Sequence, residues 1–242
     1  MEVEYLGHTV LLWTPRLRQC GKRWRRSTPV PLFSHWCGDS IGILVLLVEA
    51  LEQRLIERVG RHPSVRSVRL VGSRAEGRAT PRSDWDFLIA TDDFRAVAAD
   101  LPTFCAPLDP VAQQWDRLSS HWCWMLILRG PTKIDLIFPE QPHRHEPPWE
   151  PTPGNLPAID AHFWDWVLWL GAKEVAGEQD LIGSELQKLF QHLLAPLGVR
   201  DRPASLAAAV ARYRDARSRA EQRLAVQVPR ELETEVASAL AL

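Results

Sequence analysis

Residues 72–87 read Gly72-Ser73-Arg74-Ala75-Glu76-Gly77-Arg78-Ala79-Thr80-Pro81-Arg82-Ser83-Asp84-Trp85-Asp86-Phe87. They follow residues 65–71, whose composition predicts a strand that stops at Gly72. A glycine lets backbone N–H groups approach an anion closely, the start of a new element after a strand favours negative charge, and Ser73 adds a hydroxyl donor. The turn at Gly72 and Ser73 therefore indicates a place for phosphate groups.

Two acidic residues at the end of this stretch share one face of a second predicted strand, residues 84–90. Asp84 and Asp86 are two positions apart, so their side chains point to the same side, while Trp85, Phe87 and Ile89 point to the other. Neighbouring carboxylates repel each other unless a cation lies between them, and hard divalent cations prefer such oxygen ligands. One face of the strand is thus expected to be apolar and the opposite face acidic.

A third acid, Asp135, interrupts an apolar strand-like segment further along the chain. It lies between Ile134 and Leu136, and Lys133 and Ile137 share its face. An aspartate in such a strand is costly unless it is solvated or paired. On a strand beside the acid pair it would be a third metal ligand, and it could also orient or deprotonate an attacking hydroxyl. Alone, each of these acids would be read as an exposed strand-end residue, but the combination and its spacing are specific.

The pattern along the rest of the chain predicts an α+β fold: a small mixed β-sheet domain with flanking helices, followed by a helical domain. A helix is expected to start at Asp39 or Ser40 and end at Gly60, and another to start at a Thr91 cap. Strands are predicted over residues 122–129 and 133–138, joined by the turn Gly130-Pro131. Residues 139–158 look like a linker, and helices are expected over residues 159–176, 180–195, 205–224 and 230–241.

Three segments follow from these patterns. Residues 39–150 form the predicted catalytic domain and residues 151–242 the helical C-terminal domain. Residues 1–38 are basic, contain Pro29 and Pro31, and show no sustained periodicity. We expect them to be a poorly ordered extension, with a nucleic-acid-binding arm as the alternative.

The Gly-Ser turn, the paired acids and the distant third acid resemble the DNA-polymerase-β-type nucleotidyltransferase superfamily, and specifically its antibiotic nucleotidyltransferase branch. The motif residues are Gly72 and Ser73, Asp84 with Asp86, and Asp135. The fold resemblance covers about residues 40–140, and the segment around His162 and Lys173 supports it more weakly. Many relatives carry an arginine three residues after the serine, where this chain has Glu76, so the phosphate-side contacts depart from the family pattern.

The resemblance implies transfer of a nucleoside monophosphate from a nucleoside triphosphate, with ATP as the expected donor, to a small hydroxylated acceptor such as an aminoglycoside. Two Mg²⁺ ions held by Asp84, Asp86 and Asp135 would serve this displacement. The expected nucleotide-binding residues are Gly72, Ser73, Arg74, Ser83 and Lys173. The alternatives are a protein or RNA acceptor, as in enzymes that modify a toxin partner, and a relative that binds nucleotide without turnover.

Lys173 belongs to a tryptophan-rich segment in which His162, Trp166, Trp169 and Lys173 share one helix face by spacing. One interpretation makes this face a wall of the nucleotide site, with Lys173 on a phosphate. The other makes it a core helix whose lysine reaches solvent.

The bulk properties exclude several other classes. The 242 residues are 45% hydrophobic and 24% charged, which suits a globular protein, and the formal net charge of −1 gives no field toward nucleic acid or membrane. Four widely separated cysteines indicate neither a zinc knuckle nor a disulfide framework. Together with the absence of a secretory-signal pattern, this predicts a cytoplasmic protein without a membrane partner.

Overall fold

The computed structural model describes residues 2–5, 8–11, 51–144, 146 and 149–242. The start of the helix expected at Asp39 or Ser40 lies outside these residues, but residues 51–60 are helical. Within the predicted N-terminal extension, β1 (Glu2–Tyr5) and β2 (His8–Leu11) form an antiparallel pair. The remainder of that extension lies outside the described part of the chain.

A five-stranded mixed sheet forms the centre of the first half of the described chain. Its order is β3-β4-β7-β6-β5, and its strands are β3 (Val65–Val71), β4 (Trp85–Thr91), β5 (Pro110–Trp115), β6 (His121–Leu128) and β7 (Thr132–Pro142). Only β4 and β7 run parallel; the other neighbours are antiparallel. The α+β fold class with a mixed sheet is therefore confirmed.

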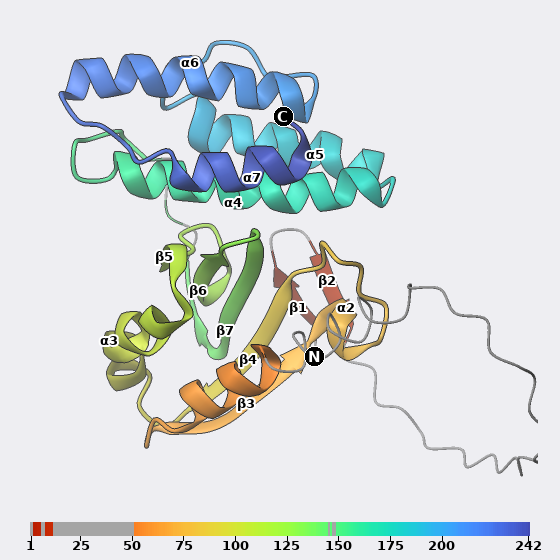
Figure 1. Cartoon of the computed structure of the whole chain (residues 1–242). Coiled ribbons are helices and arrows are strands. Elements are labelled where there is room, and N and C mark those ends of the chain that lie inside the picture. Colours follow the sequence, from red (N-terminus) through yellow and green to blue (C-terminus); the bar gives the residue numbers. More distant parts are fainter. Residues whose placement is uncertain (1, 6–7, 12–50, 145, 147–148) are drawn as a thin grey trace, which may run out of the picture.

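One face of this sheet is covered by two helices. α3 (Phe94–Cys105) and the helix of residues 51–60 pack against it through Leu101 and Leu55, which join Phe87 and Ile89 in one hydrophobic cluster. The apolar side of β4 is therefore buried as its alternation predicted (Figure 1). The predicted Thr91 cap is wrong: Thr91 ends β4, and the Asp93 side chain accepts from Ala96 N at the start of α3.

The other end of the chain forms a layer of helices that lies against the sheet domain (Figure 1). They are α4 (Leu156–Val175), α5 (Gln179–Leu189) with η2 (Phe190–Leu194), α6 (Leu206–Leu224) and α7 (Glu231–Leu240). α7 lies very close to α4, because a Cβ on Gly171 would be 2.5 Å from Leu240 Cδ2. No helix in the described part of the chain is long and apolar enough to cross a membrane.

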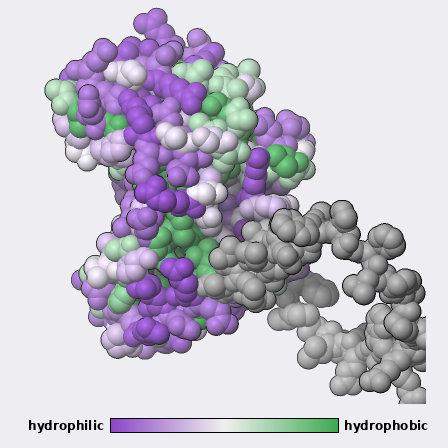
Figure 2. Space-filling model, in the orientation of Figure 1, coloured by the Kyte–Doolittle hydropathy of each residue, from purple (hydrophilic) through white to green (hydrophobic). Residues whose placement is uncertain are grey.

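A second hydrophobic cluster fills the helical layer, and it also includes Ile127 of β6 and Trp149, which precedes α4. In the space-filling view the molecule narrows between the two layers, and hydrophobic residues gather just below the narrowing (Figure 2). Two clusters agree with two cores, but Ile127 of the sheet domain belongs to the cluster of the helical layer, so the boundary at residues 150 and 151 stays a prediction.

Sequence reasoning missed strand β5. Pro110 begins it, and Gln113 and Gln114 interrupt its apolar residues, so no clean alternation marks it as a strand. Its pairing with β6 brings it into the sheet, and the Gln114 side-chain amide donates to the Ala158 carbonyl at the start of α4 at 3.0 Å. This strand therefore carries one of the contacts that seat α4 on the sheet.

Candidate active site

The turn after β3 is a place where only glycine fits. Gly72 has φ +70°, in the left-handed region, and begins the short helix α2 (Gly72–Ala75) that also contains Ser73. A Cβ on Gly72 would lie 2.6 Å from Asp86 Oδ2. The turn therefore brings the backbone against one of the predicted metal ligands, and both its conformation and this close approach require the missing side chain.

The three predicted acids come together at the face of the sheet opposite α3. Asp84 directly precedes β4, and Asp86 lies on it. Asp86 and Asp135 are register partners on the parallel strands β4 and β7, so their side chains start from adjacent points of the same sheet. Asp135 is only 2% exposed. The structure thus places all three predicted ligands at one site.

Lys133 lies inside this acidic site. It is two residues before Asp135 on β7, so both side chains are on one face, and its Nζ is 2.8 Å from Asp135 Oδ1. The same Nζ is 2.8 Å from Asp165 Oδ1 on α4. Lys133 therefore joins the sheet to the first helix of the C-terminal layer, and Asp165 brings a fourth carboxylate to the site.

Burial and neighbouring charges act together on the pKa values of the acidic site. Burial raises the pKa of Asp84 to about 7, opposed by the charge of Lys133 and reinforced by Asp86 and Asp165. Burial likewise raises the pKa of Asp86, and it raises that of Asp135 well above its usual range despite Lys133.

The pKa of Lys133 behaves in the opposite sense. Burial alone would lower it, but Asp135, Asp165 and Asp84 together outweigh burial and hold it well above its usual value. The neighbouring carboxylates therefore favour the charged ammonium form of Lys133 within the acidic site.

The donor set fits hard divalent cations. Asp84, Asp86 and Asp135 offer only oxygen ligands, which hard divalent cations prefer, and the three acids lie within one site. Within the described residues, no three His, Cys, Asp or Glu side chains already form a ready metal-binding group. One reason is visible at Asp135, whose Oδ1 is occupied by Lys133.

Lys173 lies on α4 close enough to the acid pair for its charge to oppose the rise in the pKa values of Asp84 and Asp86. Its Nζ is 3.2 Å from Glu178 Oε1 and 5.6 Å from the centroid of the Trp169 ring. The expected face that also included Trp166 is only partly right. Trp166 is buried, and its indole N–H donates to Glu185 on α5, so it belongs to the helical core.

Two other residues predicted for nucleotide binding are engaged by the turn between α2 and β4. The Arg74 Nε donates to the carbonyls of Ser83 and Asp84, each at 3.0 Å, and its guanidinium lies 4.1 Å from the Trp85 ring centroid. The Ser83 hydroxyl accepts from Thr80 N at 2.9 Å. These contacts give Arg74 and Ser83 a structural role in shaping the loop; their contact with nucleotide stays a prediction.

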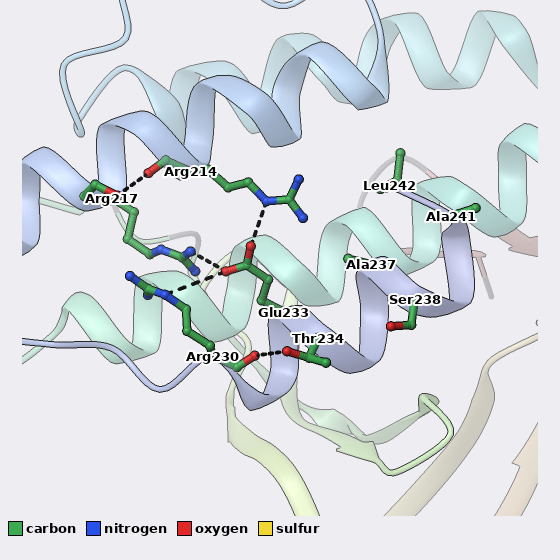
Figure 3. A pocket seen from close by; sticks show the side chains of 10 residues that line it. Arg214, Arg217, Arg230, Glu233, Thr234, Ala237, Ser238, Ala241 and Leu242 are labelled. Carbon is green, nitrogen blue, oxygen red and sulfur yellow. Dashed lines mark hydrogen bonds and ion pairs between the residues drawn. The ribbon is translucent and has the colours of Figure 1, made fainter.

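A separate cavity of about 590 Å³ lies between α6 and α7. Figure 3 shows that Arg214, Arg217 and Arg230 converge there on Glu233. Arg217 is also 2.7 Å from the buried Asp160. Because acidic partners neutralise these guanidinium groups, the cavity has the character of a structural ion-pair network, and it contains none of the residues predicted for the nucleotide.

The structure brings together the features that the motifs predicted: paired acids at one strand, a third acid at the same register on its parallel neighbour, and a Gly-Ser turn against them. Residues 51–144 match the family model described as nucleotidyltransferase domain. This match supports, for that part of the chain, the nucleotidyltransferase resemblance that the motifs indicated.

The other comparisons add no closer identification. Among solved structures, an aminoglycoside 6-adenyltransferase from Bacillus subtilis aligns with 78% of this chain and 97% of that chain, at 11% identity and a TM-score of 0.29. No curated protein matches the chain.

Sequence reasoning noticed that Lys133 shares a face with Asp135 but did not predict its role. The signal was a lysine two residues before an acid in an otherwise apolar strand, where burial would be costly without partners. Spacing along the helix does not distinguish Asp165 from the other acids near Lys173. The tertiary structure selects it, because α4 turns Asp165 toward Lys133.

Proposed function

We propose that this protein transfers a nucleoside monophosphate, AMP from ATP, to a hydroxyl group of a small acceptor with release of pyrophosphate. Nucleotidyl transfer is the activity that the domain family implies. The observation that carries the proposal is the register of Asp86 and Asp135 on parallel strands, with Asp84 beside them and the Gly72 turn in contact with Asp86. No other group of residues in the described chain combines a glycine turn with adjacent acids in this way.

In this proposal Asp84, Asp86 and Asp135 hold two Mg²⁺ ions. When bound, such ions neutralise charge on the phosphates and activate the attacking oxygen. The residues of the chain supply the rest: the Gly72–Ser73 turn receives the phosphates, and Lys173 adds positive charge from α4. Positioning and charge stabilisation provide most of the rate acceleration in such transfers.

The helical layer supports a two-substrate reaction. α4 places Lys173 and Asp165 opposite the acids of the sheet, so the site has a wall from each layer. Water is more easily excluded from a site with two walls. Asp165 and the residual negative charge favour a cationic acceptor, and the motif resemblance suggests an aminoglycoside or related antibiotic. We expect this reaction to take place in the cytoplasm.

Two other functions would use the same residues. The first is transfer to a protein or RNA acceptor, and the second is nucleotide binding without turnover. The acid triad argues against the second, because three adjacent carboxylates with raised pKa values, one buried and two half-buried, are costly to keep in a protein that only binds nucleotide.

The experiment is a pyrophosphate-release assay with MgATP, first alone and then with a panel of hydroxylated acceptors that includes aminoglycosides. Mass spectrometry of the acceptor would detect the added nucleotide. Asp86→Asn is the inactive control, and Asp92→Asn, on an exposed residue paired with Arg66, is the matched active control. Labelled nucleotide on protein or RNA would favour the alternative acceptor. Tight MgATP binding without pyrophosphate from any acceptor would contradict the proposal.

A further inference from the structure

The buried lysine of the acidic site contacts two carboxylates from different layers. Lys133 Nζ is 2.8 Å from Asp135 Oδ1 on β7 and 2.8 Å from Asp165 Oδ1 on α4, and the lysine side chain is only 8% exposed. A buried ammonium is tolerated only when it is paired. One of the two paired oxygens belongs to Asp135, a proposed metal ligand. Lys133 and a divalent cation would therefore compete for the same carboxylate.

One ammonium cannot neutralise this site. Asp84, Asp86, Asp135 and Asp165 all interact with the Lys133 charge or with one another, and Lys173 adds a second positive charge at the edge. The site therefore keeps an excess of negative charge with Lys133 in place. Removing the charge of Lys133 would increase that excess, and the site would then bind a divalent cation more tightly.

We propose that Lys133 is an internal counter-ion that holds Asp135 when no metal is bound, competes with divalent cations for it, and links this competition to α4 through Asp165. The inference rests on the proposed function, since it takes Asp135 as a metal ligand. It adds a positioning residue whose two partners lie on different layers of the molecule.

The arrangement has a mechanical consequence. A cation at Asp135 repels the nearby ammonium of Lys133, and Asp165 is the partner that remains for it. The Lys133–Asp135 pair within β7 would then be lost, and the existing Lys133–Asp165 pair between β7 and α4 would remain. Metal binding would thus strengthen the contact between the sheet and the helical layer that carries Lys173.

The inference is tested by measuring the affinity of the full chain for Mn²⁺ in the absence of nucleotide. Electron paramagnetic resonance or calorimetry can measure this affinity. Lys133→Met keeps the length of the side chain and removes the charge. We expect it to bind Mn²⁺ at least about ten-fold more tightly than the unaltered protein, the scale of one close charge interaction. Lys133→Arg should restore weak binding. Lys188→Met removes another lysine–carboxylate pair, with Glu185, and should change nothing.

Melting temperatures give a second readout. In EDTA, Lys133→Met should have a lower melting temperature than the unaltered protein, because the acids lose their counter-charge. Addition of Mn²⁺ should raise the melting temperature of Lys133→Met by more than that of the unaltered protein. If Lys133 had only a structural role, Lys133→Met would distort the site and bind Mn²⁺ more weakly than the unaltered protein. Equal or weaker Mn²⁺ binding by Lys133→Met overturns the inference.

If Lys133→Met does not fold, Asp165→Asn decides. Without Asp165 the ammonium pairs with Asp135 alone, so Mn²⁺ binding should weaken at least several-fold relative to Glu178→Gln, which removes a carboxylate paired with Lys173. No difference between these two variants would overturn the inference. Failure of the proposed function looks different: the unaltered protein would bind no Mn²⁺, or Asp86→Asn would bind it equally well.

Discussion

Asp86 on β4 and Asp135 on β7 occupy the same register of two adjacent parallel strands, although 49 positions separate them in the sequence. This pair of strands is the parallel connection in an otherwise antiparallel sheet. Side chains at one register of neighbouring strands start within about 5 Å of each other. The pairing therefore converts two distant aspartates into one site.

The first prediction concerns this acid pair. Asp86→Asn should abolish nucleotidyl transfer, because it removes a proposed metal ligand, while the metal-free protein should melt at the same or a higher temperature. Pyrophosphate release and thermal unfolding in EDTA check the two parts. Asp92→Asn, which alters an exposed ion pair with Arg66, should keep normal activity. Near-normal turnover by Asp86→Asn would rule out the proposed metal site.

The second prediction compares two glycines with the same backbone conformation. Gly72 and Gly77 have φ of +70° and +68°, so an alanine at either position costs about 1 kcal/mol of strain. Only at Gly72 would the new Cβ meet Asp86, at 2.6 Å, whereas nothing lies within 4 Å at Gly77. Gly72→Ala should therefore lose Mn²⁺ binding and activity as well as stability, and Gly77→Ala only stability. Equal activities for the two variants would contradict this reading of the turn.

The third prediction is a pH dependence in EDTA. The pKa of Asp84 rises from an ordinary 3.8 to about 7 in the folded protein, chiefly through burial. The folded state then binds more protons than the unfolded state between these values, so the free energy of unfolding should fall as pH rises from about 4 to about 7. Urea unfolding across this range measures it, and Asp84→Asn should flatten the slope. An unchanged slope in that variant would mean that Asp84 ionises normally.

The fourth prediction concerns Lys173. Lys173→Ala should weaken MgATP binding by about ten-fold, as expected for one charge-assisted contact, while circular dichroism stays the same. Calorimetry with MgATP and a non-hydrolysable analogue measures this. Lys188→Ala, on α5, is the control for loss of a paired lysine in the helical layer. If Lys173→Ala binds MgATP as tightly as this control, Lys173 contributes only its contact with Glu178.

The fifth prediction concerns the core of the helical layer. Arg217 is 3% exposed and 2.7 Å from Asp160, which also accepts from the Tyr213 hydroxyl at 2.7 Å. Arg217→Met leaves Asp160 without its counter-charge, so the free energy of unfolding should fall by about 3–5 kcal/mol. Arg61→Met, at an exposed pair with Glu57, should cost less than about 1 kcal/mol. Urea unfolding compares them, and similar losses would contradict the role assigned to the buried pair.

Local sequence patterns were sufficient for most elements of the structure and for the list of acids. Alternation of polar and apolar residues marks β4 because one face is buried, and the Gly-Ser turn and the acid spacing depend on neighbours in the chain. The same local rules missed β5, whose strand character depends on pairing with β6 rather than on its own composition.

The amino-acid sequence by itself determined the fold class, the acidic face of β4 and the candidate metal ligands, since each depends on local spacing. Only the tertiary structure decided that Asp135 stands beside Asp86, that Lys133 is charged and buried between Asp135 and Asp165, and that Trp166 belongs to the core. The physical reason is that strand order and the rotation of α4 against the sheet arise from packing over the whole chain. Spacing along one element does not contain that information.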